Sequence, residues 1–194
     1  DQLAQEILPQ LRYSRISASI NTIGRSDEEI VAQYKDDASK LSVDEILYAA
    51  TLTNDNKQKE DIYAKAAKLY PNDYRTFNNL GKAQYVNGKY NAAKENFEKA
   101  AALNPKSEEV NMNLGLVKLA EKDYNAARQY FGAAANAEGV NDALGVYYLR
   151  QGDYQTAVKA FGNSKTNNAA LAQILTKDYS GAQATLNAVA EPNA

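Results

Sequence analysis

A tyrosine recurs in one local setting along this chain, and the repetition constrains the fold more than any other feature. Tyr90, Tyr124, Tyr154 and Tyr179 each follow a short polar turn and precede an alanine three residues later. Successive tyrosines lie 34, 30 and 25 residues apart (124 − 90, 154 − 124 and 179 − 154). Self-similarity at this period is typical of stacked helical hairpins, in which each hairpin contacts only its neighbours. Such an array offers a long surface and lacks an enclosed catalytic pocket.

The clearest repeat unit covers residues 74–105. An Asn87-Gly88 turn separates two segments whose apolar residues recur every three or four positions, as on one face of an α-helix. Pro105 follows the second segment and stops it. We expect Gly81 and Ala93 to let the two helices approach closely while large rings fill the space around them. The other regularly spaced positions of the unit are Phe77, Leu80, Tyr85, Tyr90, Phe97 and Ala100.

This unit resembles the tetratricopeptide repeat (TPR), whose pattern is a large aromatic, Leu-Gly, Tyr, then Ala, Phe, Ala and a closing Pro. The matching residues are Phe77, Leu80-Gly81, Tyr90, Ala93, Phe97, Ala100 and Pro105. Weaker copies follow at 108–138 and beyond, each shorter than the last, and a degenerate copy precedes at 41–71. The resemblance implies an all-α, right-handed TPR-like solenoid over residues 41–190, with four full hairpins and one abbreviated hairpin. We expect the turns or helix ends of the later units to be trimmed.

Residues 1–40 differ from the repeats and predict a helix-strand-helix extension. Apolar residues of Leu3–Leu11 form one helical face, and Ile16–Ile20 alternates between apolar and polar residues as a strand does. Ser26 and Glu29 have the spacing of a capping box before another helix. A lone strand needs hydrogen-bond partners. It could pair with its copy in a homodimer, belong to the sheet of a preceding module, or be an irregular extended segment.

A second resemblance bears on the location of the protein. Residues 6–12, 24–30, 47–53 and 167–173 are similar to segments of a Gram-negative envelope family in which an outer-membrane-protein-A-like (OmpA-like) module precedes a TPR array. This resemblance implies a cell-envelope location, periplasmic or associated with the outer membrane, with residues 3–20 as the tail of the preceding module. It carries no functional residue onto this chain. The absence of cysteine is compatible with cytosol and periplasm alike.

Composition excludes several classes of function. With 22 basic against 24 acidic residues the net charge is −2, so no basic field favours nucleic acid. No apolar run approaches the roughly 20 residues that a membrane-spanning helix needs. Cysteine and histidine are absent, which removes thiolate metal sites, the commonest general base and the commonest transition-metal ligand. Without a phosphate loop or nucleophile motif, we expect no enzyme, no catalytic residue, no metal and no cofactor.

The candidate binding residues are first-helix positions that a TPR array turns to its concave side. Their amides and cations can hold a peptide backbone or carboxylate, and their apolar members can take side chains. Alternatively, the apolar members pack on neighbouring first helices. The recurring tyrosines 90, 124, 154 and 179 are expected in the core. The candidate binding residues are Tyr48, Arg75, Asn78, Asn79, Lys82, Tyr85, Met112, Asn113 and Leu116.

These observations predict a non-catalytic scaffold whose concave groove binds a peptide segment or partner protein. The alternative is a structural spacer that links a peptidoglycan-associated module to other envelope components and has no specific ligand. A continuous exposed apolar patch on the concave face would favour binding, whereas a uniformly polar face would favour the spacer.

Overall fold

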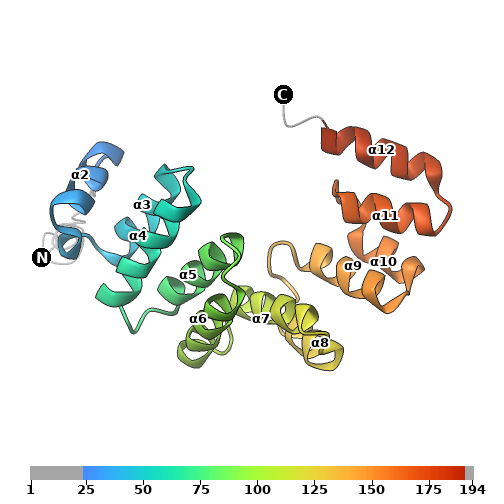
Figure 1. The fold of residues 1–194 in the computed structure, drawn as a ribbon, viewed down its shortest axis with the longest axis horizontal. Coiled ribbons are helices and arrows are strands. Elements are labelled where there is room, and N and C mark those ends of the chain that lie inside the picture. The colour runs from blue at the N-terminus through green and yellow to red at the C-terminus, as the bar shows by residue number, and fades with distance from the viewer. Residues whose placement is uncertain (1–23, 191–194) are drawn as a thin grey trace, which may run out of the picture.

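The computed structural model describes residues 24–190, and this part of the chain is entirely helical (Figure 1). No strand occurs among these residues. Two short 3-10 turns, Ala38–Lys40 and Ala50–Leu52, flank the second helix. The α-helices are α2 (Asp27–Asp37), α3 (Val43–Ala49), α4 (Asn56–Leu69), α5 (Tyr74–Val86), α6 (Tyr90–Leu103), α7 (Glu108–Ala120), α8 (Tyr124–Gly132), α9 (Val140–Gln151), α10 (Tyr154–Phe161), α11 (Asn167–Leu175) and α12 (Tyr179–Ala190).

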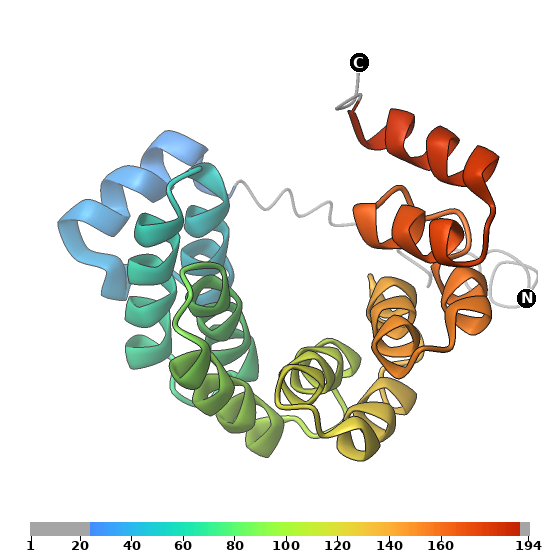
Figure 2. The same cartoon turned by 45° about the vertical axis from the view of Figure 1, so that its right-hand side comes forward.

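Helices α3 to α12 form five antiparallel hairpins that stack side by side along an arc (Figure 2). Helix α2 lies at one end of the arc, where Ile30 joins the buried core of α3 and α4, and α11 and α12 lie at the other end. The predicted all-α solenoid of hairpins is therefore confirmed. The predicted helix Leu3–Leu11 and strand Ile16–Ile20 lie outside the described residues. The helix-strand-helix extension is thus unsupported, although its last helix exists as α2.

The helices begin where their capping residues predict. The Ser42 hydroxyl accepts a hydrogen bond from the Glu45 backbone N–H at 3.2 Å, and the Glu45 carboxylate accepts one from the Ser42 N–H at 2.8 Å. Ser26 forms the same reciprocal box at the start of α2. Asp73 and Ser107 cap α5 and α7. Each cap satisfies backbone donors that the first helical turn leaves without an intrahelical acceptor.

A glycine on the first helix and a phenylalanine on the second hold three hairpins together. Phe97, Phe131 and Phe161 are all buried, and each ring lies directly against the backbone of a glycine. A Cβ added at Gly81 would lie 2.7 Å from the Phe97 ring, a distance that real Cβ atoms do not show. At the equivalent positions 115 and 145, a Cβ would approach Phe131 and Phe161 to 2.5 Å. The expected close approach of the two helices is confirmed.

The recurring tyrosines occupy a different place from the one predicted. Tyr90 is 61% exposed and Tyr179 is 65% exposed, Tyr154 is also exposed, and Tyr124 is half-buried. Their assignment to the core was therefore wrong for Tyr90, Tyr154 and Tyr179, whereas Tyr124 packs against the core of α7, α8 and α9. Each tyrosine is the first residue of the second helix, directly after the turn, so its ring lies at the edge of the hairpin where few side chains can cover it.

The turns inside four of the five hairpins, α5/α6 to α11/α12, place one residue in the left-handed backbone region. Gly88 and Gly152 occupy this position with φ of 77°, and Lys122 and Lys177 occupy it with φ of 63° and 67°. Glycine adopts this conformation without steric cost, whereas a residue with a Cβ does not. The second helix shortens from 14 residues in α6 to 9 in α8 and 8 in α10, whereas in the last hairpin the first helix is short, since α11 has 9 residues where α5 has 13.

Replacing Gly81 with alanine should lower the free energy of unfolding by about 1–3 kcal/mol, because the new methyl group overpacks against a buried ring. Chemical denaturation followed by circular dichroism would measure it. Gly132→Ala is the matched control, since no atom lies within 4 Å of the Cβ position at this helical residue. It should be neutral or stabilising by up to about 1 kcal/mol. Equal effects of the two substitutions would contradict the close-packing role.

Candidate interaction surface

The predicted binding residues all lie on the first helices of the hairpins, in α3, α5 and α7. In Figure 2, α7 lies on the inner side of the arc and α8 on its outer side. The nine residues differ widely in accessibility. The exposed ones are Tyr48, Lys82 and Tyr85; the half-buried ones are Arg75, Asn79, Met112 and Leu116; the buried ones are Asn78 and Asn113.

Asn78 and Asn113 bind each other. The Asn113 side-chain amide donates a hydrogen bond of 2.8 Å to the Asn78 Oδ1 atom, and the residues are only 6% and 1% exposed. A buried amide needs such a partner because water cannot reach it. The structure therefore places these two amides in the interface between α5 and α7, where they join consecutive hairpins and face each other instead of a ligand.

Ion pairs join the same first helices at the surface. The Arg75 guanidinium lies 2.7 Å from Asp44 of the preceding hairpin and 2.6 Å from its own neighbour Asp73, and Lys82 lies 2.9 Å from Glu109 of the following hairpin. Hydrogen bonds from Arg75 lower the pKa of the Asp73 carboxyl below its ordinary value. Exposed ion pairs contribute about 0–1 kcal/mol each, so they can exchange partners when a charged ligand arrives.

The two predicted tyrosines have local partners of their own. The Tyr48 hydroxyl donates a hydrogen bond of 3.1 Å to Asp27 of α2, and this bond raises the pKa of Tyr48. The Tyr85 ring meets the Tyr90 ring edge-on, with centroids 5.1 Å apart. Tyr48 therefore ties the first hairpin to α2, and Tyr85 lies at the turn end of α5.

The apolar candidates favour the packing alternative. Leu116 packs against the core formed by α7, α8 and α9, and Val146 and Leu149 of α9 pack in the same way against later hairpins. Met112 is half-buried, with its sulfur near the backbone of Gly139. These side chains mainly join neighbouring hairpins, and only part of each reaches solvent.

Two pockets border the charged candidates. One lies between α4 and α5 and contains two lysines, an aromatic ring and an exposed valine; its lining residues are Asn56, Lys59, Tyr63, Asn79, Lys82, Ala83 and Val86. Two of the candidate residues, Asn79 and Lys82, line this pocket. The sequence did not point to Lys59 and Tyr63, because they lie on α4, the second helix of its hairpin. Only first-helix residues were expected to line the concave side.

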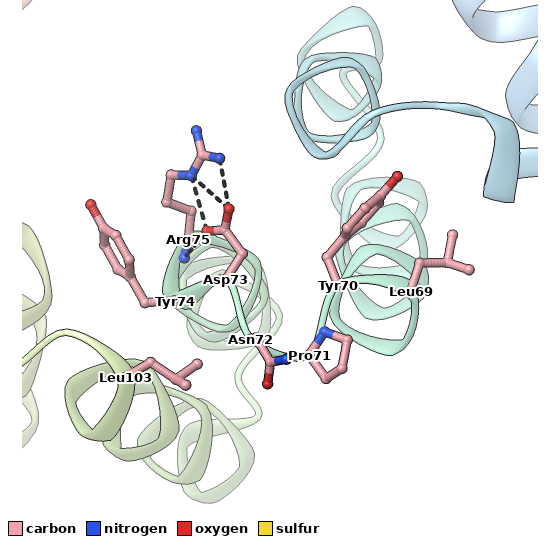
Figure 3. A pocket seen from close by; sticks show the side chains of 8 residues that line it. All are labelled: Leu69, Tyr70, Pro71, Asn72, Asp73, Tyr74, Arg75 and Leu103. Atoms are coloured by element: carbon pink, nitrogen blue, oxygen red, sulfur yellow. Dashed lines mark hydrogen bonds and ion pairs between the residues drawn. The ribbon is translucent and has the colours of Figure 1, made fainter.

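The other pocket lies at the α4–α5 turn, beside the end of α6 (Figure 3). In Figure 3, Pro71 and Asn72 lie between Leu103 on one side and Tyr70 and Leu69 on the other, and Asp73 holds the Arg75 guanidinium. The Tyr70 hydroxyl donates a hydrogen bond to the Leu41 backbone carbonyl. Since two carboxylates already neutralise Arg75, this pocket presents no free charged group to a ligand.

Neither a metal site nor a membrane span emerges from the described part of the chain. Between residues 24 and 190, no three acidic side chains converge as ligands for an ion would. No described helix combines the length and the hydropathy that crossing a bilayer demands.

Residues 78–141, which run from within α5 to the start of α9, match the family model of the tetratricopeptide repeat. The predicted resemblance is thus confirmed for the two hairpins with the most complete sequence pattern, and the hairpins on either side continue the same architecture. Comparison with curated proteins found no match.

Solved structures of TPR proteins share the fold at low sequence identity. A TPR protein from Parabacteroides merdae is 15% identical, with a TM-score of 0.65 over 86% of this chain and 73% of that one. PilF of Pseudomonas aeruginosa is 18% identical, with a TM-score of 0.59 over 88% and 79% of the two chains. YrrB, a TPR protein with an unusual peptide-binding site, is 18% identical, with a TM-score of 0.54 over 84% and 91%. At this identity the likeness establishes the fold alone.

Replacing Asn113 with alanine should destabilise the protein by about 1–3 kcal/mol, because the Asn78 Oδ1 atom would remain buried without a donor. Thermal and urea unfolding would measure the change. Asn79→Ala, which removes the half-exposed amide next to Asn78 in α5, should stay within about 0.5 kcal/mol of the wild type. A neutral Asn113→Ala variant would show that the amide pair does not join the hairpins.

Replacing Arg75 with glutamine should raise the pKa of Asp73 toward its ordinary 3.8, though not fully, since the backbone N–H of residue 75 still donates to it. A carboxyl with a lowered folded-state pKa contributes stability that is present above its unfolded pKa and is lost as pH falls through the folded value. The variant should therefore lose less stability below about pH 4 than the wild type does. Carbon-detected NMR titration would follow Asp73, and Arg25→Gln, which removes a partner of Glu45 instead, should leave the Asp73 pKa unchanged.

Proposed function

We propose that this protein is a non-catalytic interaction scaffold that binds an extended or helical segment of a partner protein along the inner side of its arc. The observation that supports this most is the row of accessible polar side chains on consecutive first helices. Tyr48 on α3, Lys82 on α5 and Glu109 on α7 are all exposed or half-exposed. A scaffold needs such a continuous surface, and a stack of hairpins provides it.

The pocket between α4 and α5 supplies the chemistry for one anchoring point. Lys59 and Lys82 bring positive charge, Tyr63 and Val86 bring apolar surface, and Asn79 brings an amide that can donate to or accept from a peptide backbone. A carboxylate of the partner can replace Glu109 on Lys82, because the Lys82–Glu109 pair is about half exposed on both sides. We therefore expect the bound segment to carry an acidic residue beside an apolar one.

Two comparisons support a protein or peptide partner. TPR arrays as a class use concave surfaces of this kind, and YrrB, with the same fold, has a peptide-binding site. The site of that protein is not transferred residue by residue, because the identity is only 18%.

We further propose that the scaffold works in the cell envelope, in the periplasm or at the outer membrane. This proposal depends on the sequence resemblance of residues 6–12, 24–30, 47–53 and 167–173 to OmpA-like envelope proteins with TPR arrays. Homodimerisation through Ile16–Ile20 likewise stays a prediction, since that segment lies outside the described residues.

One observation favours the alternative function of a spacer without a specific ligand. The charged side chains of consecutive first helices are already paired within the chain, as Arg75 with Asp44 and Lys82 with Glu109. In a spacer, these pairs would serve only to fix the angle between hairpins.

A random 12-residue peptide library, selected on the full chain, would separate the two functions. Binding of the selected peptides should weaken at least about tenfold in the Asn79→Ala/Lys82→Glu double variant, since both groups line the proposed anchoring pocket. The matched control is Asn91→Ala/Lys94→Glu on the second helix α6. It likewise breaks an ion pair between two hairpins, the one between Lys94 and Glu121, whose side chains are about one-third exposed. A library without binders, or binders that tolerate the first variant, would leave the spacer as the better account.

A further inference from the structure

The last hairpin exposes apolar positions that an earlier hairpin buries. Hairpins α7/α8 and α11/α12 correspond with a constant offset of 55 residues (174 − 119 and 186 − 131). Leu119 is 2% exposed, whereas Ile174 at the same position is 42% exposed. Phe131 is 1% exposed, whereas Leu186 is 38% exposed. The difference therefore lies in what covers each hairpin and not in the residue class.

In the α7/α8 hairpin, these apolar positions are covered by α9, the first helix of the next hairpin. Tyr147 of α9 lies edge-on to Tyr124 and Phe131, with ring centroids 6.2 and 6.3 Å away. Ala143, one helical turn earlier, joins the same core, which also contains Leu119. In addition, the Arg150 guanidinium donates a hydrogen bond of 3.2 Å to the Leu119 backbone carbonyl. Helix α9 thus packs against both α7 and α8.

Hairpin α11/α12 lies at the open end of the arc, and no described helix covers it as α9 covers α7/α8 (Figure 2). Its exposed apolar residues form a set that we call the terminal patch. Two of its members, Leu171 and Tyr179, correspond to Leu116 and Tyr124 by the same offset of 55 residues. The terminal patch consists of Leu171, Ile174, Leu175, Tyr179 and Leu186.

We propose that the terminal patch binds an amphipathic α-helix of a partner protein, seated as α9 is seated on α7/α8. The interface between α9 and the α7/α8 hairpin sets the chemistry of that helix. It needs a small residue, a large aromatic or aliphatic residue four positions later, and an arginine three positions after that, as in Ala143, Tyr147 and Arg150. The arginine would donate to the Ile174 backbone carbonyl, the counterpart of the Leu119 carbonyl.

A second copy of this chain fits the terminal patch less well. A symmetric dimer requires one surface that is complementary to itself. The interface that continues here consists of two helices with a third seated against both, so its two sides have different shapes.

The test uses the full chain and a capped peptide of residues 140–151, which carries the Ala143, Tyr147 and Arg150 pattern. Titration of the peptide into isotope-labelled protein should produce saturable amide shift changes in α11 and α12. Ile174→Lys should weaken this binding at least about tenfold. Leu103→Lys is the matched control because Leu103 is also 42% exposed and also lies near the end of a helix. A peptide with Tyr147→Glu should not bind.

Several outcomes would overturn the proposal. These are no binding of the peptide, shift changes confined to other hairpins, or equal weakening by Leu103→Lys. A wild-type dimer that Ile174→Lys dissociates would show that a second copy occupies the patch. Peptide binding that strengthens at least about tenfold when residues 1–23 are removed would show that this segment of the chain itself occupies it. The terminal patch shares no residue with the pocket of Asn79 and Lys82. Helix binding at the patch can therefore fail while peptide binding at the pocket holds, and the reverse.

Discussion

The contact between a glycine on the first helix and a phenylalanine ring on the second is the constraint on which the rest of this array depends. Gly81, Gly115 and Gly145 each leave room for a ring that would otherwise collide with a Cβ. The ring in turn fills the space between helices and leaves no void, which a protein interior does not tolerate cheaply. Because the contact recurs, successive hairpins have similar internal geometry and can stack in one direction.

The contacts between hairpins are of a different kind and vary along the chain. An apolar core, one amide pair and the exposed Lys82–Glu109 ion pair join α5/α6 to α7, whereas Tyr147 and its aromatic neighbours join α7/α8 to α9. This change divides the array. The interfaces of its first half contain polar groups besides the apolar packing, whereas those of its second half consist mainly of apolar side chains. The two proposed sites follow from this division, one in each half.

Much of the fold could be predicted from the sequence, because the pattern that encodes it is local. Glycine-phenylalanine spacing, capping boxes at Ser26 and Ser42, and turns at regular intervals all act within one hairpin. The candidate site was harder, because exposure depends on the neighbouring hairpin. Asn78 looks like a free amide until Asn113, 35 residues later, is placed against it. The edge position of Tyr90 and the contribution of Lys59 and Tyr63 to a pocket likewise depend on how hairpins stack, which periodicity along the chain does not encode.

The left-handed position in the turns of the four later hairpins has a consequence for how such an array can diversify. Gly88, Lys122, Gly152 and Lys177 show that the backbone there accepts either residue type, and all four are exposed. A lysine costs roughly 1 kcal/mol more than glycine in this conformation, yet its side chain leaves the packing of the helices untouched. Each of these turns is therefore a position where a substitution can change the surface charge of one hairpin. The packing of the core does not change with it.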